Sequence, residues 1–130
     1  MPREIITAPD VTPYRSGLSH AVKAAGLVFV SGATPFTGAR AANLIARGDF
    51  AAQTHQVMQN IKAILAAAGT SLDRAVKMNV ALADMKNYAE FDAIFKTYFA
   101  PGNYPARQTT ESVHLSHMDF MLSVDCIAEA

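Results

Sequence analysis

Apolar residues recur at helical spacing in the middle of the chain. Between Asp49 and Gly69 they stand at positions 57, 61, 64, 65 and 68, which is the spacing of one buried helical face. A glycine commonly follows the last turn of such a helix, because it adopts the left-handed backbone conformation freely. We therefore predict a helix over residues 50–68.

A second helical stripe is aromatic. Tyrosine and phenylalanine stand at positions 88, 91, 95 and 98, which again places them on one face of a helix. Asn87 followed by Glu90 has the spacing of a capping box, so we expect the helix to begin there. We expect it to end before Pro101, because proline cannot continue a helix.

Alternation of apolar and polar residues predicts strands elsewhere. In residues 76–83, valine, methionine and leucine alternate with lysine, asparagine and alanine, which is the period of a half-buried strand. Residues 20–26 and 27–30 are two shorter β-rich runs joined at Ala25-Gly26. They predict a hairpin whose second strand ends at Ser31-Gly32.

The last part of the chain, after Pro105, is also rich in β-forming residues. Residues 107–115 and 120–128 are separated by the turn-like sequence Ser-His-Met-Asp. We expect these two closing strands to pair with each other.

The order of these elements predicts an α+β fold. Both helices pack on one face of a sheet, because each has one apolar stripe to bury. Without a repeat or a linker, residues 1–130 are expected to form a single domain. The other face of the sheet would expose valine, methionine and phenylalanine, so we predict an oligomer that buries this face. A clean monomer in sedimentation at micromolar concentration would contradict this expectation.

Composition narrows the class of protein. Eleven basic and eleven acidic residues give a formal net charge of zero, without a run of lysine or arginine, which argues against nucleic acid as a partner. The N-terminal segment is too polar for a signal peptide and no apolar run approaches a membrane span, so we predict a cytoplasmic protein. The lone Cys126 excludes an intrachain disulfide and is expected to be buried. The usual cofactor and hydrolase motifs do not occur.

Four segments, in order along the chain, resemble the RidA family, the YjgF-type reactive intermediate deaminases. They are residues 19–32 (SHAVKAAGLVFVSG), 59–69, 77–99 and 104–115 (YPARQTTESVHL), and a closing VDCIA follows them. The resemblance implies a chorismate mutase-like fold: a mixed six-stranded sheet with two helices on one face, assembled as a homotrimer with ligand clefts between subunits. It also implies hydrolysis of 2-aminoacrylate-like enamines or imines to 2-oxo acids and ammonia, without a metal or a coenzyme.

By this resemblance, Arg107 occupies the position of the substrate-gripping arginine. A planar guanidinium binds a carboxylate through two parallel hydrogen bonds, which suits a small carboxylate ligand. The alternative is an arginine in a surface or interface ion pair. Ser31 and Gly32 fall at the border of the cleft, where glycine allows close approach of the ligand, or else they form a plain strand end. Thr109 falls where a backbone carbonyl contacts the attacking water.

Two positions depart from the family pattern. Ser123 stands where the deaminases commonly carry a glutamate that positions or activates water, and Asp125 follows on the same strand face. A serine hydroxyl can orient water but cannot accept its proton without a partner, so general-base help is lost there. Leu18 stands where many members have an active-site tyrosine. Tyr14 replaces that tyrosine only if the N-terminal segment loops back.

Other side chains allow two interpretations each. Tyr88 matches an aromatic position near the cleft, or it belongs to the core stripe of its helix. His20 can act as a substitute acid or base, or it is a hydrogen-bonded strand histidine. His114, His117 and Asp119 have the composition of a metal site, but a strand end and turn does not bring both imidazoles together, so we predict no metal.

The leading hypothesis is therefore a deaminase with Arg107 and Ser123 as catalytic residues, which acts on a small carboxylate metabolite. The alternative is a non-catalytic homologue that binds small carboxylates, because the glutamate of the family appears as Ser123. A third label, endoribonuclease or translation inhibitor, is attached to some relatives, and the neutral charge balance argues against it.

Overall fold

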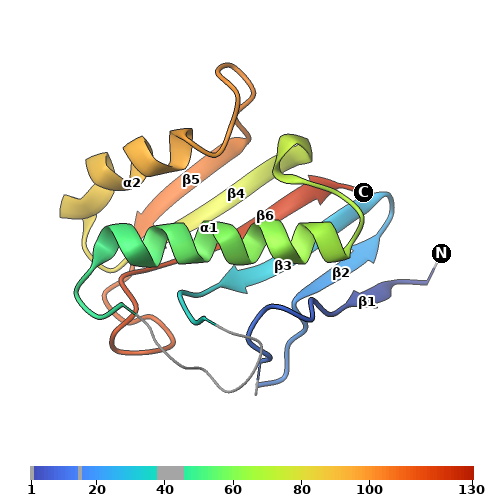
Figure 1. Cartoon of the computed structure of the whole chain (residues 1–130), viewed down its shortest axis with the longest axis horizontal. Helices are drawn as coiled ribbons and strands as arrows, with labels where there is room; N and C mark the ends of the chain where they lie inside the picture. Colours follow the sequence, from blue (N-terminus) through green and yellow to red (C-terminus); the bar gives the residue numbers. More distant parts are fainter. Residues whose placement is uncertain (1, 15, 38–45) are drawn as a thin grey trace.

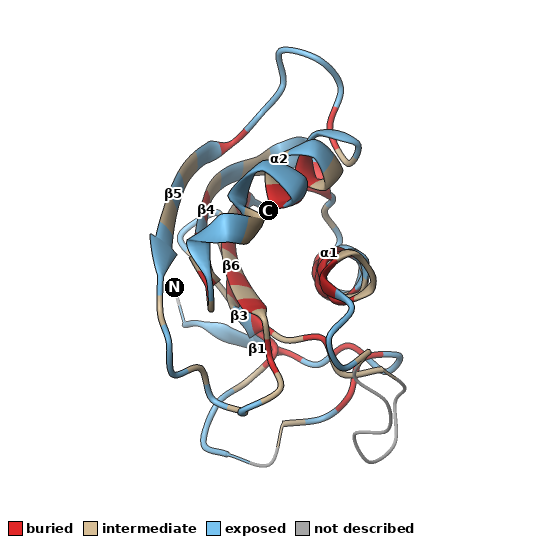
Figure 2. Cartoon of the chain, turned by 90° about the vertical axis from the view of Figure 1, so that its left-hand side faces the viewer, coloured by how far each residue is buried: buried red, intermediate tan, exposed pale blue. Residues whose placement is uncertain are grey.

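A six-stranded sheet of mixed direction forms the centre of the protein, and two helices cover one of its faces (Figures 1 and 2). The computed structural model describes residues 2–14, 16–37 and 46–130. The elements in chain order are β1 (Glu4–Ile6), β2 (Ala21–Ala24), β3 (Leu27–Ala33), α1 (Phe50–Ala67), η1 (Leu72–Arg74), β4 (Ala75–Leu82), η2 (Met85–Asn87), α2 (Tyr88–Lys96), β5 (Ala106–Glu111) and β6 (Leu122–Glu129). The predicted fold class is confirmed.

The strand order of the sheet is β1-β2-β3-β6-β4-β5. β4 and β5 run parallel, whereas all other neighbours are antiparallel. The last strand of the chain thus inserts between β3 and β4, and β5 forms one edge of the sheet. The prediction that the two closing strands pair with each other is wrong, because each of them pairs with β4, on opposite sides of it.

Local side chains fix both ends of α1. Asp49 accepts a hydrogen bond from the Ala52 amide at 3.0 Å, which satisfies one of the free N–H groups of the first turn. At the other end, Gly69 adopts a left-handed φ of +84°. The fully buried face of the helix packs on β3 and β6 and consists of Val57, Met58, Ile61, Ile64 and Leu65. The helix predicted over residues 50–68 is confirmed.

The second helix begins at the predicted position, with Asn87 as its N-cap residue, but its start is capped differently from the prediction. Asn87 makes no capping hydrogen bond with its side chain, and the short turn η2 precedes α2. Asp84 accepts a hydrogen bond from the Lys86 amide at 2.9 Å and so caps that turn. The start of the helix predicted at Asn87 is therefore confirmed, whereas the predicted capping box of Asn87 and Glu90 is wrong, because Asn87 makes no side-chain capping hydrogen bond.

The predicted hairpin is present and has a two-residue turn. Ala25 and Gly26 have φ angles of 54° and 77°, and two left-handed residues match the twist of the flanking strands. β3 continues to Ala33, and its register with β6 shifts between Val30 and Ala33. Ser31 and Gly32 lie within this irregular stretch.

The two faces of the sheet differ in chemistry. The helix side of β4 and β6 carries the buried residues Met78, Val80, Leu82, Leu122, Val124 and Cys126. The opposite face carries Lys77, Asn79, Ser123, Asp125 and Ile127, together with Phe29, which is 41% exposed. In the described part of the chain, no helix covers this second face (Figure 2). None of the described helices has the length and apolar character that crossing a membrane requires.

One residue of the predicted buried face of β4 points the other way. Val76 is 46% exposed, because the pairing of β4 with β6 shifts register between Ala75 and Lys77. Such a bulge inserts an extra residue and turns its side chain out of the regular alternation.

Candidate functional site

Arg107 lies on the edge strand β5 and points to the helix side of the sheet, where its register partner on β4 is Met78. Its Nη1 donates to Oδ1 of Asp92 at 2.9 Å, and its Nη2 donates to the Tyr88 hydroxyl at 2.8 Å. The guanidinium carbon also stands 4.8 Å from the ring centre of Phe95. Two neighbouring turns of α2 therefore hold the arginine in one orientation.

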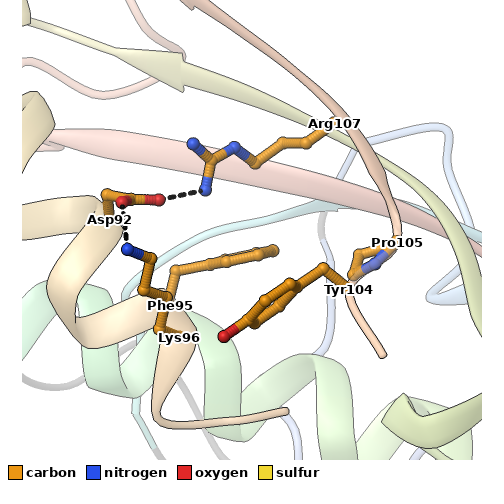
Figure 3. A pocket seen from close by; sticks show the side chains of 6 residues that line it. All are labelled: Asp92, Phe95, Lys96, Tyr104, Pro105 and Arg107. Atoms are coloured by element: carbon orange, nitrogen blue, oxygen red, sulfur yellow. Dashed lines mark hydrogen bonds and ion pairs between the residues drawn. The ribbon is translucent and has the colours of Figure 1, made fainter. Parts of the chain in front are cut away.

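The arginine cavity, as we call the hollow beside this group, has a volume of about 290 Å³. It is lined by Asp92, Phe95, Lys96, Tyr104, Pro105 and Arg107 (Figure 3). The Arg107 side chain is 16% exposed, so it is largely desolvated but still reaches the cavity. A guanidinium has five N–H donors, and its bonds to Asp92 and Tyr88 use two of them.

Asp92 sits between two cations. Its Oδ1 accepts from Arg107, and its Oδ2 lies 3.3 Å from Nζ of Lys96. The hydrogen bond from Arg107, followed by that from Lys96, holds the pKa of the Asp92 carboxyl below its usual range, although partial burial opposes this. Asp92 is therefore ionised at neutral pH.

A second hollow, the N-terminal cavity, has a volume of about 610 Å³. Its lining includes Tyr14, Leu18, Gly32, Phe36, His117 and Phe120. The Tyr14 hydroxyl donates to the Gly32 carbonyl at 3.5 Å, so the N-terminal segment does loop back and brings this tyrosine into the lining of the same cavity as Leu18. Burial raises the pKa of the Tyr14 hydroxyl above its usual value near 10, which keeps it protonated.

His20 holds this N-terminal loop in place. The ring is 4% exposed, its Nδ1 accepts from the Ala8 amide at 2.9 Å, and its Nε2 donates to the Thr12 carbonyl at 3.0 Å. Because both ring nitrogens are engaged, His20 fits the hydrogen-bonded alternative and is not placed to act as an acid or a base. The Ser31 hydroxyl is likewise engaged, since it donates to the Ser19 carbonyl at 2.6 Å.

Gly32 leaves open space above its backbone. A Cβ built on it meets no atom within 4 Å, so packing within the described chain does not explain the glycine. Thr109 follows Arg107 on the helix side of β5, and its buried Oγ1 has no hydrogen-bond partner among the described residues.

Ser123 lies apart from Arg107. It faces the side of the sheet that carries no helix, opposite Ala81, whereas Arg107 faces the helices. The chain therefore brings Arg107 and its partner Tyr88 together beside the arginine cavity, whose lining does not include Tyr88, and it brings Leu18 and Gly32 together in the N-terminal cavity. It does not bring either pair to Ser123 within one chain.

The other residues considered from the sequence have structural contacts. Nδ1 of His117 accepts from the Asp119 amide at 3.1 Å, and its ring packs against Phe36 and Phe120. In residues 2–14, 16–37 and 46–130, no three His, Cys, Asp or Glu side chains cluster as a metal would require. Cys126 is buried, as expected, and burial together with the Asp125 charge raises the pKa of its thiol to about 12.

Sequence reasoning missed Asp92, which is the main partner of Arg107. A signal was available, because Tyr88, Asp92 and Lys96 follow each other at intervals of four residues on α2 and so share one helical face. What the spacing alone could not show is that this face turns towards β5.

Comparison with known proteins shows the family of this chain. The endoribonuclease L-PSP family matches residues 8–130. The mitochondrial protein MMF1 of Saccharomyces cerevisiae is 44% identical over 87 residues, which cover 67% of this chain and 58% of that protein. The match spans about three fifths of the length of the curated yeast relatives.

Solved structures match over nearly the whole length. RidA from the Antarctic bacterium Psychrobacter has a TM-score of 0.89 and 31% identity, with 98% of this chain and 99% of that chain covered. TdcF from E. coli, solved with bound serine, has a TM-score of 0.87 and 25% identity, with 98% of each chain covered. The chain is therefore a member of the endoribonuclease L-PSP family, to which the RidA and YjgF proteins belong.

Proposed function

We propose that this protein hydrolyses small 2-imino or enamine carboxylates, of the 2-aminoacrylate type, to 2-oxo acids and ammonia. The observation that carries the proposal is Arg107, which is held against α2 beside an open cavity. Its bonds to Asp92 and Tyr88 leave three of its five N–H donors without a partner among the described residues. A guanidinium in this state binds a carboxylate through charge-assisted hydrogen bonds.

Hydrolysis of an imine requires the protein mainly to position the substrate and water. Water adds to the carbon of the C=N bond, the C–N bond then breaks, and ammonia leaves behind a 2-oxo acid. The reacting carbon is bonded directly to the carboxylate. When Arg107 binds the carboxylate, it therefore also fixes the position of this carbon and the direction from which water can attack it. The reaction needs neither a metal nor a coenzyme.

The bound serine of the relative TdcF supports a ligand of this size. Serine carries a carboxylate on a carbon that also bears nitrogen, as 2-imino acids do. The zero net charge of the chain gives no support to RNA cleavage, although the family is described as endoribonuclease L-PSP. We also propose that the protein is cytoplasmic. The relatives do not decide this location, because one yeast relative is mitochondrial.

We further propose that the complete cleft forms between subunits of a homotrimer. The arginine cavity is shallow, and the N-terminal cavity with Tyr14 and Gly32 is a separate hollow of the same chain. Arg107 lies on the edge strand β5, which has a partner on one side only, so a neighbouring subunit can approach it. A subunit placed there would add a second wall to the site.

The second candidate function is binding of small carboxylates without hydrolysis. The observation that favours it is that the Ser123 hydroxyl makes no hydrogen bond to a carboxylate or an imidazole among the described residues, at a position where the resemblance implies a glutamate. Water in the cleft would then lack a general base, which is a loss of about 10²–10⁴ in rate.

One experiment separates these functions. We expect ammonia release from freshly generated 2-aminoacrylate to be faster with the protein, and Arg107→Ala to reduce kcat/KM by about 10–100-fold, because a charge-assisted bond is worth about 1.5–3 kcal/mol. Arg107→Lys should recover little, since it loses the fork geometry. Arg74→Ala removes an exposed arginine that bonds only the Ala130 carbonyl, and serves as the control.

Two other outcomes decide against the deaminase. Unaccelerated ammonia release at stoichiometric protein, with 2-oxobutyrate still bound through Arg107, would establish the carboxylate-binding function instead. Carboxylate affinity that survives Arg107→Ala would remove both proposals.

A further inference from the structure

The arginine cavity already contains a carboxylate, and it belongs to the protein. Asp92 Oδ1 is 2.9 Å from Nη1 of Arg107, next to the remaining N–H donors to which a ligand carboxylate would bind. The Asp92 side chain is 29% exposed and lines the cavity, so a ligand on Arg107 comes into contact with it (Figure 3). Lys96 holds the second oxygen of Asp92 from the outer side.

This arrangement treats two kinds of ligand differently. A 2-oxo acid on Arg107 brings its negative charge close to Asp92 and offers it no hydrogen-bond donor, so the contact is repulsive. An amino or iminium acid carries a cationic N–H group on the carbon next to its carboxylate. When its carboxylate sits on Arg107, that nitrogen can reach Asp92 and donate to it.

Lys96 does not cancel this preference. Its side chain is 58% exposed, so its charge is screened by water much more than that of Arg107, which is 16% exposed. The role of Lys96 is to keep Asp92 in position through the i, i+4 ion pair.

We propose that Asp92 selects ligands with a protonated nitrogen on the carbon next to the carboxylate, so that the cavity prefers amino and imino acids to 2-oxo acids. This inference rests on the proposed function, because it assigns the ligand carboxylate to Arg107. It makes Asp92 a specificity-determining residue that acts by contact with the substrate nitrogen. It also means that hydrolysis weakens binding, because the 2-oxo acid product has lost the group that Asp92 holds.

The test compares, by titration calorimetry, two ligands with the same number of carbons and one carboxylate each, 2-aminobutyrate and 2-oxobutyrate, which carry an ammonium group and a carbonyl oxygen respectively on the carbon next to the carboxylate. The wild-type protein should bind 2-aminobutyrate about tenfold more tightly, the equivalent of one charge-assisted hydrogen bond. Asp92→Asn keeps the shape and an oxygen for Arg107 but removes the charge. It should abolish the preference or invert it, with tighter binding of 2-oxobutyrate.

Matched variants make the result specific. Glu90→Gln removes an exposed carboxylate from the same helix that does not line the cavity, and should leave the ratio of affinities unchanged. Asp92→Ser must shift the ratio in the same direction as Asp92→Asn, which guards against a misfolded variant. An unchanged ratio in both Asp92 variants, or an equal loss for both ligands, would overturn the inference.

The test also distinguishes this inference from the proposed function. If the wild-type protein binds neither ligand, the carboxylate site itself fails and both fall. If 2-aminobutyrate is preferred through Asp92 but 2-aminoacrylate is not hydrolysed faster, the deaminase fails and the selectivity stands.

Discussion

Thr109 carries a buried hydroxyl for which the described residues offer no hydrogen-bond partner. A buried polar group without a partner costs about 1–3 kcal/mol, because it has lost its water and gained nothing in return. Thr109→Val has the same shape and removes the hydroxyl. We expect the variant to be as stable as the wild type or about 1 kcal/mol more stable in urea unfolding.

Thr54 provides the control for this prediction. Its hydroxyl is also buried, but it donates to the Phe50 carbonyl at 2.8 Å. Thr54→Val should therefore lose about 0.5–1.5 kcal/mol. An equal loss in both variants would mean that Thr109 has a partner after all, such as a buried water.

Single residues also show what could not be predicted from the sequence. The resemblance to the family implies a tyrosine at the position of Leu18, and the structure places Tyr14 in the lining of the same cavity as Leu18. That placement depends on His20, whose bonds reach back to Ala8 and Thr12. His20 is separated from these two residues by 12 and 8 positions in the sequence. Contacts over such separations produce no periodic pattern, so a loop that returns to the sheet cannot be predicted before the fold is known.

Among the secondary-structure elements, the hairpin of β2 and β3 carries a local conflict. Ala25 has a φ of 54°, a conformation that costs an alanine about 1–2 kcal/mol. Asn-Gly is the preferred sequence for a turn with two left-handed residues. Ala25→Asn should therefore raise the free energy of unfolding by about 1 kcal/mol.

The adjacent glycine tests the same explanation with the opposite sign. Gly26 has a φ of 77°, so Gly26→Ala should destabilise the protein by about 1 kcal/mol or more, although there is open space for the methyl group. Thermal or urea unfolding of both variants checks the pair. A destabilised Ala25→Asn would show that the turn conformation is not what limits this hairpin.

The elements that the sequence predicts well are those with a periodic pattern. The apolar stripe of α1 and the apolar–polar alternation of β4 extend over many residues, and the predicted bounds of both elements agree closely with the structure. β1 has three residues, Glu4–Ile6, which is too short to display a period, and it was missed. The pairing of β5 and β6 was predicted wrongly because strand order is set by long-range contacts with β4, which local sequence does not encode.

For the whole molecule, the separation of the two cavities has a testable meaning. If the site is shared between subunits, Arg107→Ala and Gly32→Leu damage different walls of the same cleft. Each variant alone should be strongly impaired, with Arg107→Ala losing about 10–100-fold in kcat/KM. Refolded together in equal amounts, they should recover active sites in about a quarter of the clefts, those with two undamaged walls.

The readout is ammonia release from 2-aminoacrylate, with circular dichroism to confirm that each variant folds. Gly32 suits this experiment, because the space around it is open within its own chain. A mixture that exchanges subunits but stays inactive would place the complete site within one chain.

Tyrosine side chains lie at both cavities, so ligand binding there is expected to change the fluorescence of the protein. The chain has four tyrosines and no tryptophan, so its ultraviolet fluorescence comes from tyrosine alone. Tyr88 shares a hydrogen bond with Arg107, Tyr104 lines the arginine cavity, and Tyr14 lines the N-terminal cavity. A ligand that breaks the hydrogen bond between Arg107 and the Tyr88 hydroxyl changes the surroundings of a fluorescent side chain. Tyrosine fluorescence of the unlabelled protein therefore reports whether the arginine cavity is occupied.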